Sequence, residues 1–308
     1  MLNNAFKSIV LSNLLHGMRP AFTKILIALL FIFVNFNIAI AQSNGPAMAE
    51  VGISPPFLDL PMSAAQKTQS FRFFNINGKP TRVRVSVLPW TLTAEGKVEF
   101  IPATAESIDQ WVVVNPSRFA TQGGKSQVVR FSVRPAAEMS PGEHRFMMIF
   151  EQEDQSSEDT VDGESEGMMQ ALFRLESAVY VQVGESTRSA ELSLAKSSAG
   201  ELRLGLKASG SANTRIVGQA AIYQLAHFPG KEATKELVGL RNPDFKKPDA
   251  ILWTQIVPSA PVLPGSEREV PLLIEPKLPP GKYVLDLNGT LGDAALDRAF
   301  EFEIKPTP

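Results

Sequence analysis

The feature that most constrains the fold is a long run in which apolar residues alternate with other residues. Ser177 is the one interruption in a row of seven that share one parity: Met169, Ala171, Phe173, Leu175, Val179, Val181 and Val183. A period of two is typical of a β-strand with one buried face. The run spans Met169–Val183 and is longer than a common strand, which has about five or six residues. It therefore predicts a strand that can also pair with another chain.

The run follows an acidic tract, Glu151–Gly167, which is rich in Ser and Gly and carries eight acidic residues and no basic one. Such a segment is expected to be solvated. Within it, Gly163–Gly167 matches G-x-S-x-G, the nucleophile-elbow pattern of hydrolases. In that pattern the serine is catalytic only when it lies on a tight turn between a strand and a helix. Glutamates flank Ser165 and no helical pattern follows, so the tract predicts a hinge loop without a catalytic residue.

The first 41 residues are predicted to be a secretory signal peptide. Lys7, Arg19 and Lys24 give a basic start, Ile25–Val34 is apolar, and Ala39–Ala41 offers a small-residue cleavage site. A membrane anchor is the alternative, but asparagines end the apolar run short of the roughly 20 residues that a span needs. We therefore expect an exported protein with no membrane span after cleavage.

Composition excludes several classes of function. The chain has no cysteine, so neither disulfides nor thiol chemistry are available. Removing the signal takes away three positive charges and shifts the formal net charge from −2 to about −5, which gives no case for nucleic-acid binding. The two remaining histidines, His144 and His227, form no cluster with the spacing of a metal site. The sequence predicts no enzyme, no metal and no cofactor.

Short alternating runs between Pro, Gly, Asn and Ser clusters predict an all-β fold. The first half contains six of them: Phe71–Ile76, Arg82–Trp90, Lys97–Ile101, Trp111–Val114, Gln127–Arg134 and Arg145–Glu151. Regular short strands with turn signals between them are typical of a β-sandwich.

The second half repeats this pattern and part of its spelling. In each half a strand ends at a proline, Pro135 or Pro276, and the chain then turns at Pro-Gly and begins a new strand. Two tandem immunoglobulin-like sandwiches explain the repeat, with a coincidence of turn chemistry as the alternative. The predicted domains are residues 50–184 and 189–306.

Tyr283 follows the second Pro-Gly turn by two residues, and His144 holds the equivalent place after the first. A tyrosine at this place resembles the corner residue of immunoglobulin-like sandwiches, whose hydroxyl bonds nearby backbone. We expect a structural role for both side chains, which argues against His144 as a catalytic residue.

Several fragments carry a resemblance to a known family. In order, they are Val113–Phe119, Gly123–Arg130, Arg134-Pro135, Met139–Arg145 and Phe150. A proline-containing strand, a glycine-lysine turn, a strand that ends in Arg-Pro and a Pro-Gly-Glu turn follow one another at this spacing in the periplasmic pilus chaperones. The first half resembles this PapD-like family as a divergent member, and the second half matches only in its general sandwich pattern.

The resemblance implies a periplasmic chaperone that binds pilin subunits before their assembly at an outer-membrane usher. In that family the last strand of the first domain is lent to a pilin that lacks a strand. On this sequence the side chains offered would be Met169, Ala171, Phe173 and Leu175. An added strand would cover the apolar groove and the unpaired edges of an incomplete sandwich. The alternative is an ordinary edge strand, since Val179–Val183 is expected to be core.

The resemblance also implies an anchor for the pilin's terminal carboxylate, and here the sequence departs from the family. Its members use an arginine in the first strand and a lysine in the last. The first strand here, Val51–Leu60, has no basic residue, and Ser177 or a neighbour takes the lysine position. Arg174 is the candidate anchor, because a guanidinium can bind a carboxylate in bidentate fashion. A solvent-facing strand residue is the alternative.

The predicted function is strand donation to pilus subunits. A chaperone-like structural or adhesive component of a surface assembly is the second hypothesis. The sequence does not specify which subunit is bound.

Overall fold

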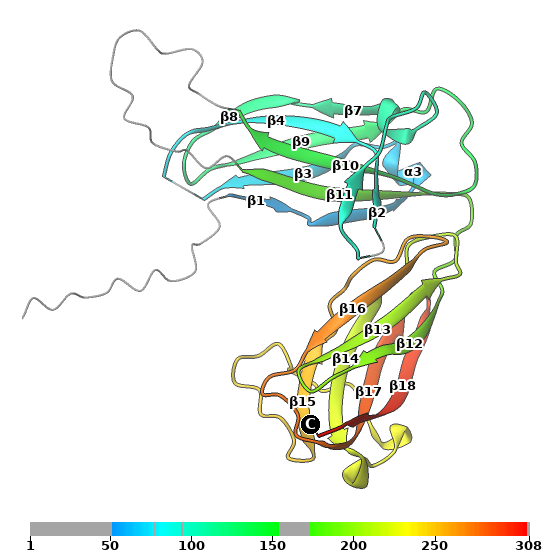
Figure 1. The fold of residues 1–308 in the computed structure, drawn as a ribbon. Coiled ribbons are helices and arrows are strands. Elements are labelled where there is room, and N and C mark those ends of the chain that lie inside the picture. Colours follow the sequence, from blue (N-terminus) through cyan, green and yellow to red (C-terminus); the bar gives the residue numbers. More distant parts are fainter. Residues whose placement is uncertain (1–50, 77, 94, 154–172, 307–308) are drawn as a thin grey trace, which may run out of the picture. The chain divides into compact units, whose positions relative to one another are not determined.

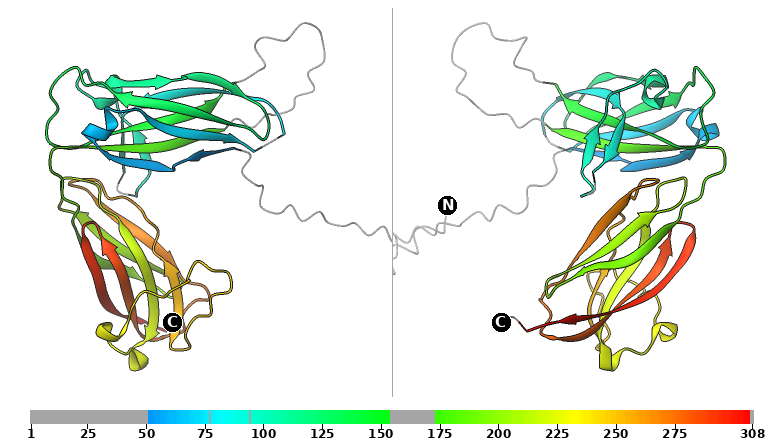
Figure 2. Two further views of the ribbon diagram at one scale, coloured as in Figure 1. Left: turned by 180° about the vertical axis from the view of Figure 1, so that it is seen from behind. Right: turned by 45° about the vertical axis from the view of Figure 1, so that its right-hand side comes forward.

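The computed structural model describes residues 51–76, 78–93, 95–153 and 173–306. They form eighteen strands, one short α-helix and three short 3-10 helices. The strands make two β-sandwiches in tandem (Figures 1 and 2), which confirms the predicted all-β fold. The predicted signal peptide lies outside the described residues, and the predicted domain limits stay predictions.

The first sandwich has two main sheets. Sheet A has the spatial order β1 (Val51–Ser54), β3 (Gln69–Asn75), β9 (Ser126–Val133) and β7 (Val112–Asn115). Sheet B has the order β2 (Phe57–Pro61), β11 (Arg174–Val183), β10 (Gly142–Gln152), β4 (Thr81–Leu88) and β8 (Arg118–Thr121). The remaining elements are α3 (Met62–Ala65), the hairpin of β5 (Trp90–Leu92) and β6 (Val98–Phe100), and η1 (Ile108–Trp111).

The prediction of a single first strand over Val51–Leu60 is wrong. The chain breaks at Pro55-Pro56, where neither residue has an N–H to donate to a ladder. Before the break β1 pairs antiparallel with β3 in sheet A, and after it β2 pairs parallel with β11 in sheet B. One segment therefore contributes an edge strand to each layer.

Phenylalanines from both sheets fill the core of this sandwich. They occupy alternate positions on their strands and are fully buried or nearly so: Phe71, Phe73, Phe131, Phe146 and Phe150. The rings of Phe71 and Phe131 stack with their centroids 5.7 Å apart. The alternation of the sequence is thus the alternation between core and surface.

Strand β10 is buried on both faces, as its continuous apolar run indicates. Its outward residues Met147 and Ile149 lie under Trp90 of β5 and Tyr180 of β11. The rings of Trp90 and Tyr180 meet edge to face, with their centroids 5.7 Å apart. The β5–β6 hairpin therefore covers part of the outward face of sheet B.

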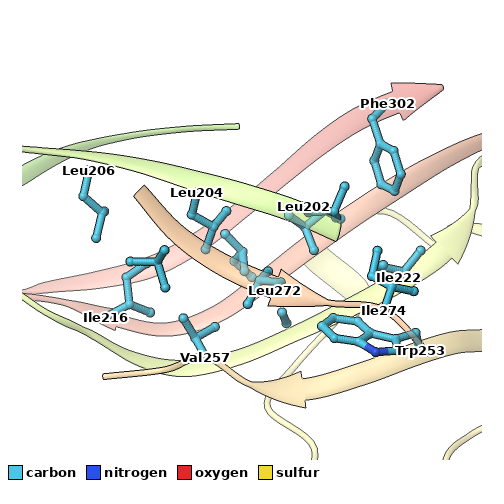
Figure 3. Packing of buried hydrophobic residues seen from close by; sticks show 14 of the residues in the cluster. Leu202, Leu204, Leu206, Ile216, Ile222, Trp253, Val257, Leu272, Ile274 and Phe302 are labelled. Atoms are coloured by element: carbon cyan, nitrogen blue, oxygen red, sulfur yellow. The ribbon is translucent and has the colours of Figure 1, made fainter. Parts of the chain in front are cut away.

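The second sandwich consists of sheets C and D. Sheet C has the order β12 (Ala190–Ser197), β13 (Glu201–Ala208) and β16 (Glu267–Leu273). Sheet D has the order β15 (Ile251–Ile256), β14 (Ile216–Gln224), β17 (Gly281–Leu291) and β18 (Ala294–Ile304), and η2 (Leu225–His227) and η3 (Lys231–Ala233) follow β14. Figure 3 shows its core, where leucines of β13 face Ile222 and Trp253 of sheet D.

The repeat seen in the sequence is a repeat of topology. In each sandwich the chain crosses from one sheet to the other at the Pro-Gly turn, from β9 to β10 and from β16 to β17. The Tyr283 hydroxyl donates to the Pro279 carbonyl at 2.7 Å, and His144 Nε2 lies 2.8 Å from the Ser140 carbonyl oxygen. Both partners lie four residues upstream, which confirms the predicted corner role.

Truncating the first core should cost far more stability than truncating the same residue type on the surface. We expect Phe131→Ala to lower the free energy of unfolding by about 3–5 kcal/mol, because it leaves a cavity among packed rings. Phe74→Ala, on the neighbouring strand but partly exposed, should cost about 1 kcal/mol or less. Urea unfolding followed by tryptophan fluorescence measures both, and equal losses would contradict this account of the core.

Candidate functional site

The candidate donor strand is β11, and its two parities have different surroundings. Val179 and Val181 are fully buried in the first core, as predicted, whereas Val183, also predicted to be core, is only half-buried and lies outside that cluster. Leu175 packs against the core and is partly buried. Ser177 is also fully buried and its hydroxyl lies 3.0 Å from the Pro56 carbonyl oxygen, to which it can donate. The polar interruption of the apolar row therefore serves a backbone carbonyl where the chain changes sheets. Met169 and Ala171 lie outside the described residues.

Strand β11 has an open edge over its first residues. On one side it pairs with β10 from Arg174 to Val183. On the other side its ladder with β2 covers only Ala178–Gln182, opposite Phe57–Pro61. Within the described ranges no strand pairs with Arg174–Ser177 on that side. Their outward-pointing backbone groups are therefore available to a further strand.

Two of the predicted donor side chains line this open edge. The Phe173 ring stacks on Phe73 with the centroids 5.7 Å apart and the planes 25° apart. Phe173 and Leu175 both pack against the first core and both stay partly exposed. The open backbone edge and the apolar side chains thus coincide at the start of β11.

Arg174, the predicted carboxylate anchor, already has partners. It belongs to a row across four strands of sheet B in which Arg118, Arg84, Glu151 and Arg174 lie opposite one another in turn. Its Nη1 lies 2.7 Å from Glu151 Oε1 and its Nε lies 2.7 Å from Glu176 Oε1. Its guanidinium carbon also lies 4.8 Å from the centre of the Phe100 ring. These contacts hold Arg174 on the outward face of the sheet.

A second arginine lies where β2 begins. The guanidinium carbon of Arg215 is 4.0 Å from the centre of the Phe57 ring and 5.1 Å from that of Tyr180. Its Nε donates to Asn213 Oδ1 at 3.1 Å. Among the residues that the structure describes, Arg215 has no ion pair, and its two terminal nitrogens have no hydrogen-bond acceptor. It is a half-buried cation with free donors.

The nearby carboxylates are satisfied by other groups. The Glu143 side chain is fully buried and accepts hydrogen bonds from the backbone N–H and side-chain amide of Asn213, at 2.6 and 2.8 Å. Asp59 accepts from Arg188 Nη2 at 2.8 Å. Glu143 also pairs with Arg145 at 3.2 Å. Neither carboxylate is therefore the partner of the Arg215 guanidinium.

The Tyr180 ring provides an aromatic surface next to the Arg215 guanidinium. Burial raises the pKa of the Tyr180 hydroxyl to about 12, although the positive charge of Arg215 opposes the shift. The ring therefore stays neutral at ordinary pH, and Arg215 stacks on an uncharged aromatic face, which attracts a cation.

The sequence pattern predicts strand β11 but does not indicate the cation Arg215. Arg215 lies on the loop side of β14, and Phe57 and Tyr180 come from two other strands. Their separation along the chain leaves no local pattern, so only the fold brings them together.

Two further features can be checked on the described part of the chain. No group of three or more His, Cys, Asp or Glu side chains in it could hold a metal ion. None of its helices has the length and apolar character needed to cross a bilayer. The Gly163–Gly167 serine motif lies outside the described residues.

Similarity to known proteins is found among solved structures. No family model matches the sequence, and no curated protein matches it. Similar solved structures include the Escherichia coli chaperone DraB, at 14% identity and a TM-score of 0.38, covering 83% of this chain and 98% of that one. The Pseudomonas aeruginosa CupB2 chaperone has 9% identity and a TM-score of 0.40, covering 82% and 100%. A third is the CsuC–CsuE chaperone–tip adhesion subunit complex of Acinetobacter baumannii, at 11% and 0.39, covering 84% and 100%.

These neighbours belong to the kind of protein that the sequence resembles. Chaperones recur among the similar solved structures, and one of them is the class 5 fimbriae chaperone CfaA.

Asp286 on β17 is a titratable group of a different kind, buried on the outward face of sheet D. Burial raises the pKa of its carboxyl, although hydrogen bonds from Thr234 and Asn288 oppose the shift. The Thr234 hydroxyl lies 2.9 Å from the Lys231 carbonyl oxygen and 3.2 Å from Asp286 Oδ1, and its single proton cannot serve both well. A protonated Asp286 could donate to Thr234, which would then donate to Lys231. Asp286 is therefore a structural residue whose burial disfavours the charged carboxylate.

Because the pKa of Asp286 is higher in the folded state, protonation favours folding. Stability from this group is present at low pH and is lost as pH rises through the folded-state pKa. We therefore expect Asp286→Asn to have a higher urea midpoint than the parent at pH 7 and a similar midpoint at pH 4. The exposed carboxylate Glu301 provides the control, since Glu301→Gln should shift neither midpoint. A less stable Asp286→Asn protein at pH 7 would contradict the argument.

Proposed function

We propose that this chain is a periplasmic chaperone that binds pilus subunits by lending them the start of β11, before their assembly at an outer-membrane usher. The observation that carries the proposal is the open edge at Arg174–Ser177, which lies beside the apolar side chains of Phe173 and Leu175. A subunit with an incomplete sandwich would gain backbone hydrogen bonds and apolar burial from this edge. Met169 and Ala171 would extend the same apolar row.

The apolar contribution of the two described donors is substantial. Burying a Phe or Leu side chain contributes about 1.5–3 kcal/mol relative to an exposed one. Both side chains are already partly covered by the first core, so each would contribute less than this on binding. Ladder hydrogen bonds and the two further donors would add to them.

Arg215 fits the role of carboxylate anchor better than Arg174. A strand that ran parallel to β11 beside Arg174–Ser177, as β2 does further along, would end near Phe57. Its terminal carboxylate would then lie beside the free donors of Arg215, which stacks on that ring. Arg174 would have to give up Glu151 and Glu176 to take the same ligand. Arg215, which directly precedes β14 of the second sandwich, would thus supply the cation that the first strand lacks.

The second hypothesis is a structural or adhesive component of a surface assembly that keeps the chaperone fold. It also uses strand pairing, but it places the protein permanently in the assembly. Purified surface fibres separate the two, since a chaperone is absent from them and a component is present in stoichiometric amounts.

Strand donation predicts a specific loss of partner binding. When a pilin subunit and this protein are co-expressed in the periplasm, we expect a soluble complex that Phe173→Asp abolishes, because the aspartate would enter an apolar groove. Leu273→Asp is the matched control, since Leu273 is 63% exposed on the second sandwich. Co-purification measures complex formation, and circular dichroism checks that each variant is folded. A pilin that is equally soluble without this protein would refute the proposal.

Carboxylate anchoring predicts a non-additive pair of changes. Arg215→Gln should weaken the complex about 10- to 100-fold, the effect of losing a charge-assisted hydrogen bond. Two glycines added to the subunit's C-terminus, which move its carboxylate, should weaken binding to the parent by a similar factor and to Arg215→Gln hardly at all. Arg174→Gln should change the affinity less than threefold. Additive losses for Arg215→Gln and the extension, measured by titration calorimetry, would exclude Arg215 as the anchor.

A further inference from the structure

The outward face of sheet A carries positive charge that its own strands do not neutralise. Arg72 on β3 and Arg130 on β9 are both exposed on this face. None of the four strands of sheet A contains an acidic residue. Neither arginine has an ion pair in the described part of the chain. Arg72 Nη1 donates a hydrogen bond to Ser126 Oγ at 3.1 Å.

Sheet B of the same sandwich treats its arginines differently. Arg84 and Arg118 both pair with Glu153, at 3.7 and 3.0 Å. Arg145 and Arg174 pair with glutamates at 3.2 and 2.7 Å. The sandwich therefore neutralises these cations on one sheet and leaves Arg72 and Arg130 unpaired on the other.

The two free arginines border an open hollow of about 480 Å³. Its wall combines hydroxyl, apolar and guanidinium groups, and its lining residues are Ser54, Pro55, Ser70, Arg72, Phe74, Val128 and Arg130. Phe74 is 36% exposed there. The hollow thus offers apolar contact next to two charged donors, all from residues of the first sandwich.

The spacing of the arginines suits an extended peptide. Arg72 lies opposite Val128, and Arg130 lies opposite Ser70, so the two arginines are diagonal neighbours on adjacent strands. Such residues are about 7–8 Å apart. Side chains at positions i and i+2 of an extended chain are about 6.6–6.8 Å apart. Two carboxylates at alternate positions of one peptide can therefore meet both guanidiniums.

We propose that this hollow binds an extended acidic segment of a partner protein, with carboxylates at alternate positions on Arg72 and Arg130. Bidentate pairing supplies the orientation, and Phe74 and Val128 supply apolar surface beside the two guanidiniums. The chain's own residues 154–172 are a less suitable occupant, because they join β10 to β11 and both strands belong to sheet B. The hollow and the open edge of β11 meet at Pro55, whose carbonyl oxygen lies 3.3 Å from the Ser177 hydroxyl, but both arginines belong to sheet A. The proposal does not depend on strand donation.

The test uses a fluorescein-labelled peptide, Thr-Glu-Thr-Glu-Thr, and the full-length protein at low salt. Fluorescence anisotropy should show binding that weakens about tenfold or more in Arg72→Gln and in Arg130→Gln, as expected for the loss of a charge-assisted contact. Arg118→Gln, on sheet B, is the matched control and should stay within twofold of the parent. The isomeric peptide Thr-Thr-Glu-Glu-Thr should bind more weakly, because its carboxylates point to opposite sides.

Three results would overturn the proposal. One is no binding of the alternating peptide, and another is equal binding of the two peptides. The third concerns a variant in which a Gly-Ser linker replaces residues 155–166. If this variant binds the alternating peptide tenfold or more tightly, and Arg72→Gln abolishes that gain in affinity, the chain's own tract would be the occupant of the hollow. Because Arg72 and Arg130 are exposed, thermal unfolding should show folded variants. Arg72→Gln should leave pilin binding unchanged, which separates this site from the proposed function.

Discussion

The rest of the first sandwich depends on a pair of adjacent prolines that cannot donate backbone hydrogen bonds. Pro55-Pro56 ends β1 in sheet A and lets the chain resume as β2 in sheet B. Because β2 starts opposite Ala178, the preceding residues of β11 have no partner on that side among the residues described. The buried Ser177 hydroxyl lies beside the Pro56 carbonyl at this crossing. An interruption in one ladder thus creates the edge on which the proposed function depends.

The arginines of the described chain have distinct roles that their surroundings assign. Arg118 and Arg174 of sheet B are paired with glutamates, and such exposed pairs contribute modestly to stability. Arg215 lies against the Phe57 and Tyr180 rings and keeps free donors, and Arg72 and Arg130 border a hollow and have no ion pair within the described residues. A guanidinium that pairs with no carboxylate of its own chain can bind a carboxylate of a partner. Pairing within the fold therefore sets Arg118 and Arg174 apart from Arg72, Arg130 and Arg215.

Much of the fold could be predicted because alternation is a local property. The inward positions of β3, β9 and β10 follow from the spacing of their apolar residues, and the corner roles of Tyr283 and His144 follow from the Pro-Gly turns. The first strand was predicted as one element because its apolar pattern runs through the prolines. Ladder pairing, which prolines interrupt, is not visible in that pattern.

The sequence by itself determined the all-β class, the tandem repeat and the parity of β11, because period-two burial and turn chemistry are encoded within a few neighbouring residues. Tertiary structure decided which edge of β11 is open, how Arg174 is occupied and where an unpaired cation lies. Arg215 precedes β14, whereas Phe57 and Tyr180 come from β2 and β11, and Arg72 and Arg130 meet only through the register of β3 and β9. Charge pairing acts over a few ångströms in space, so residues far apart along the chain decide which arginines remain free.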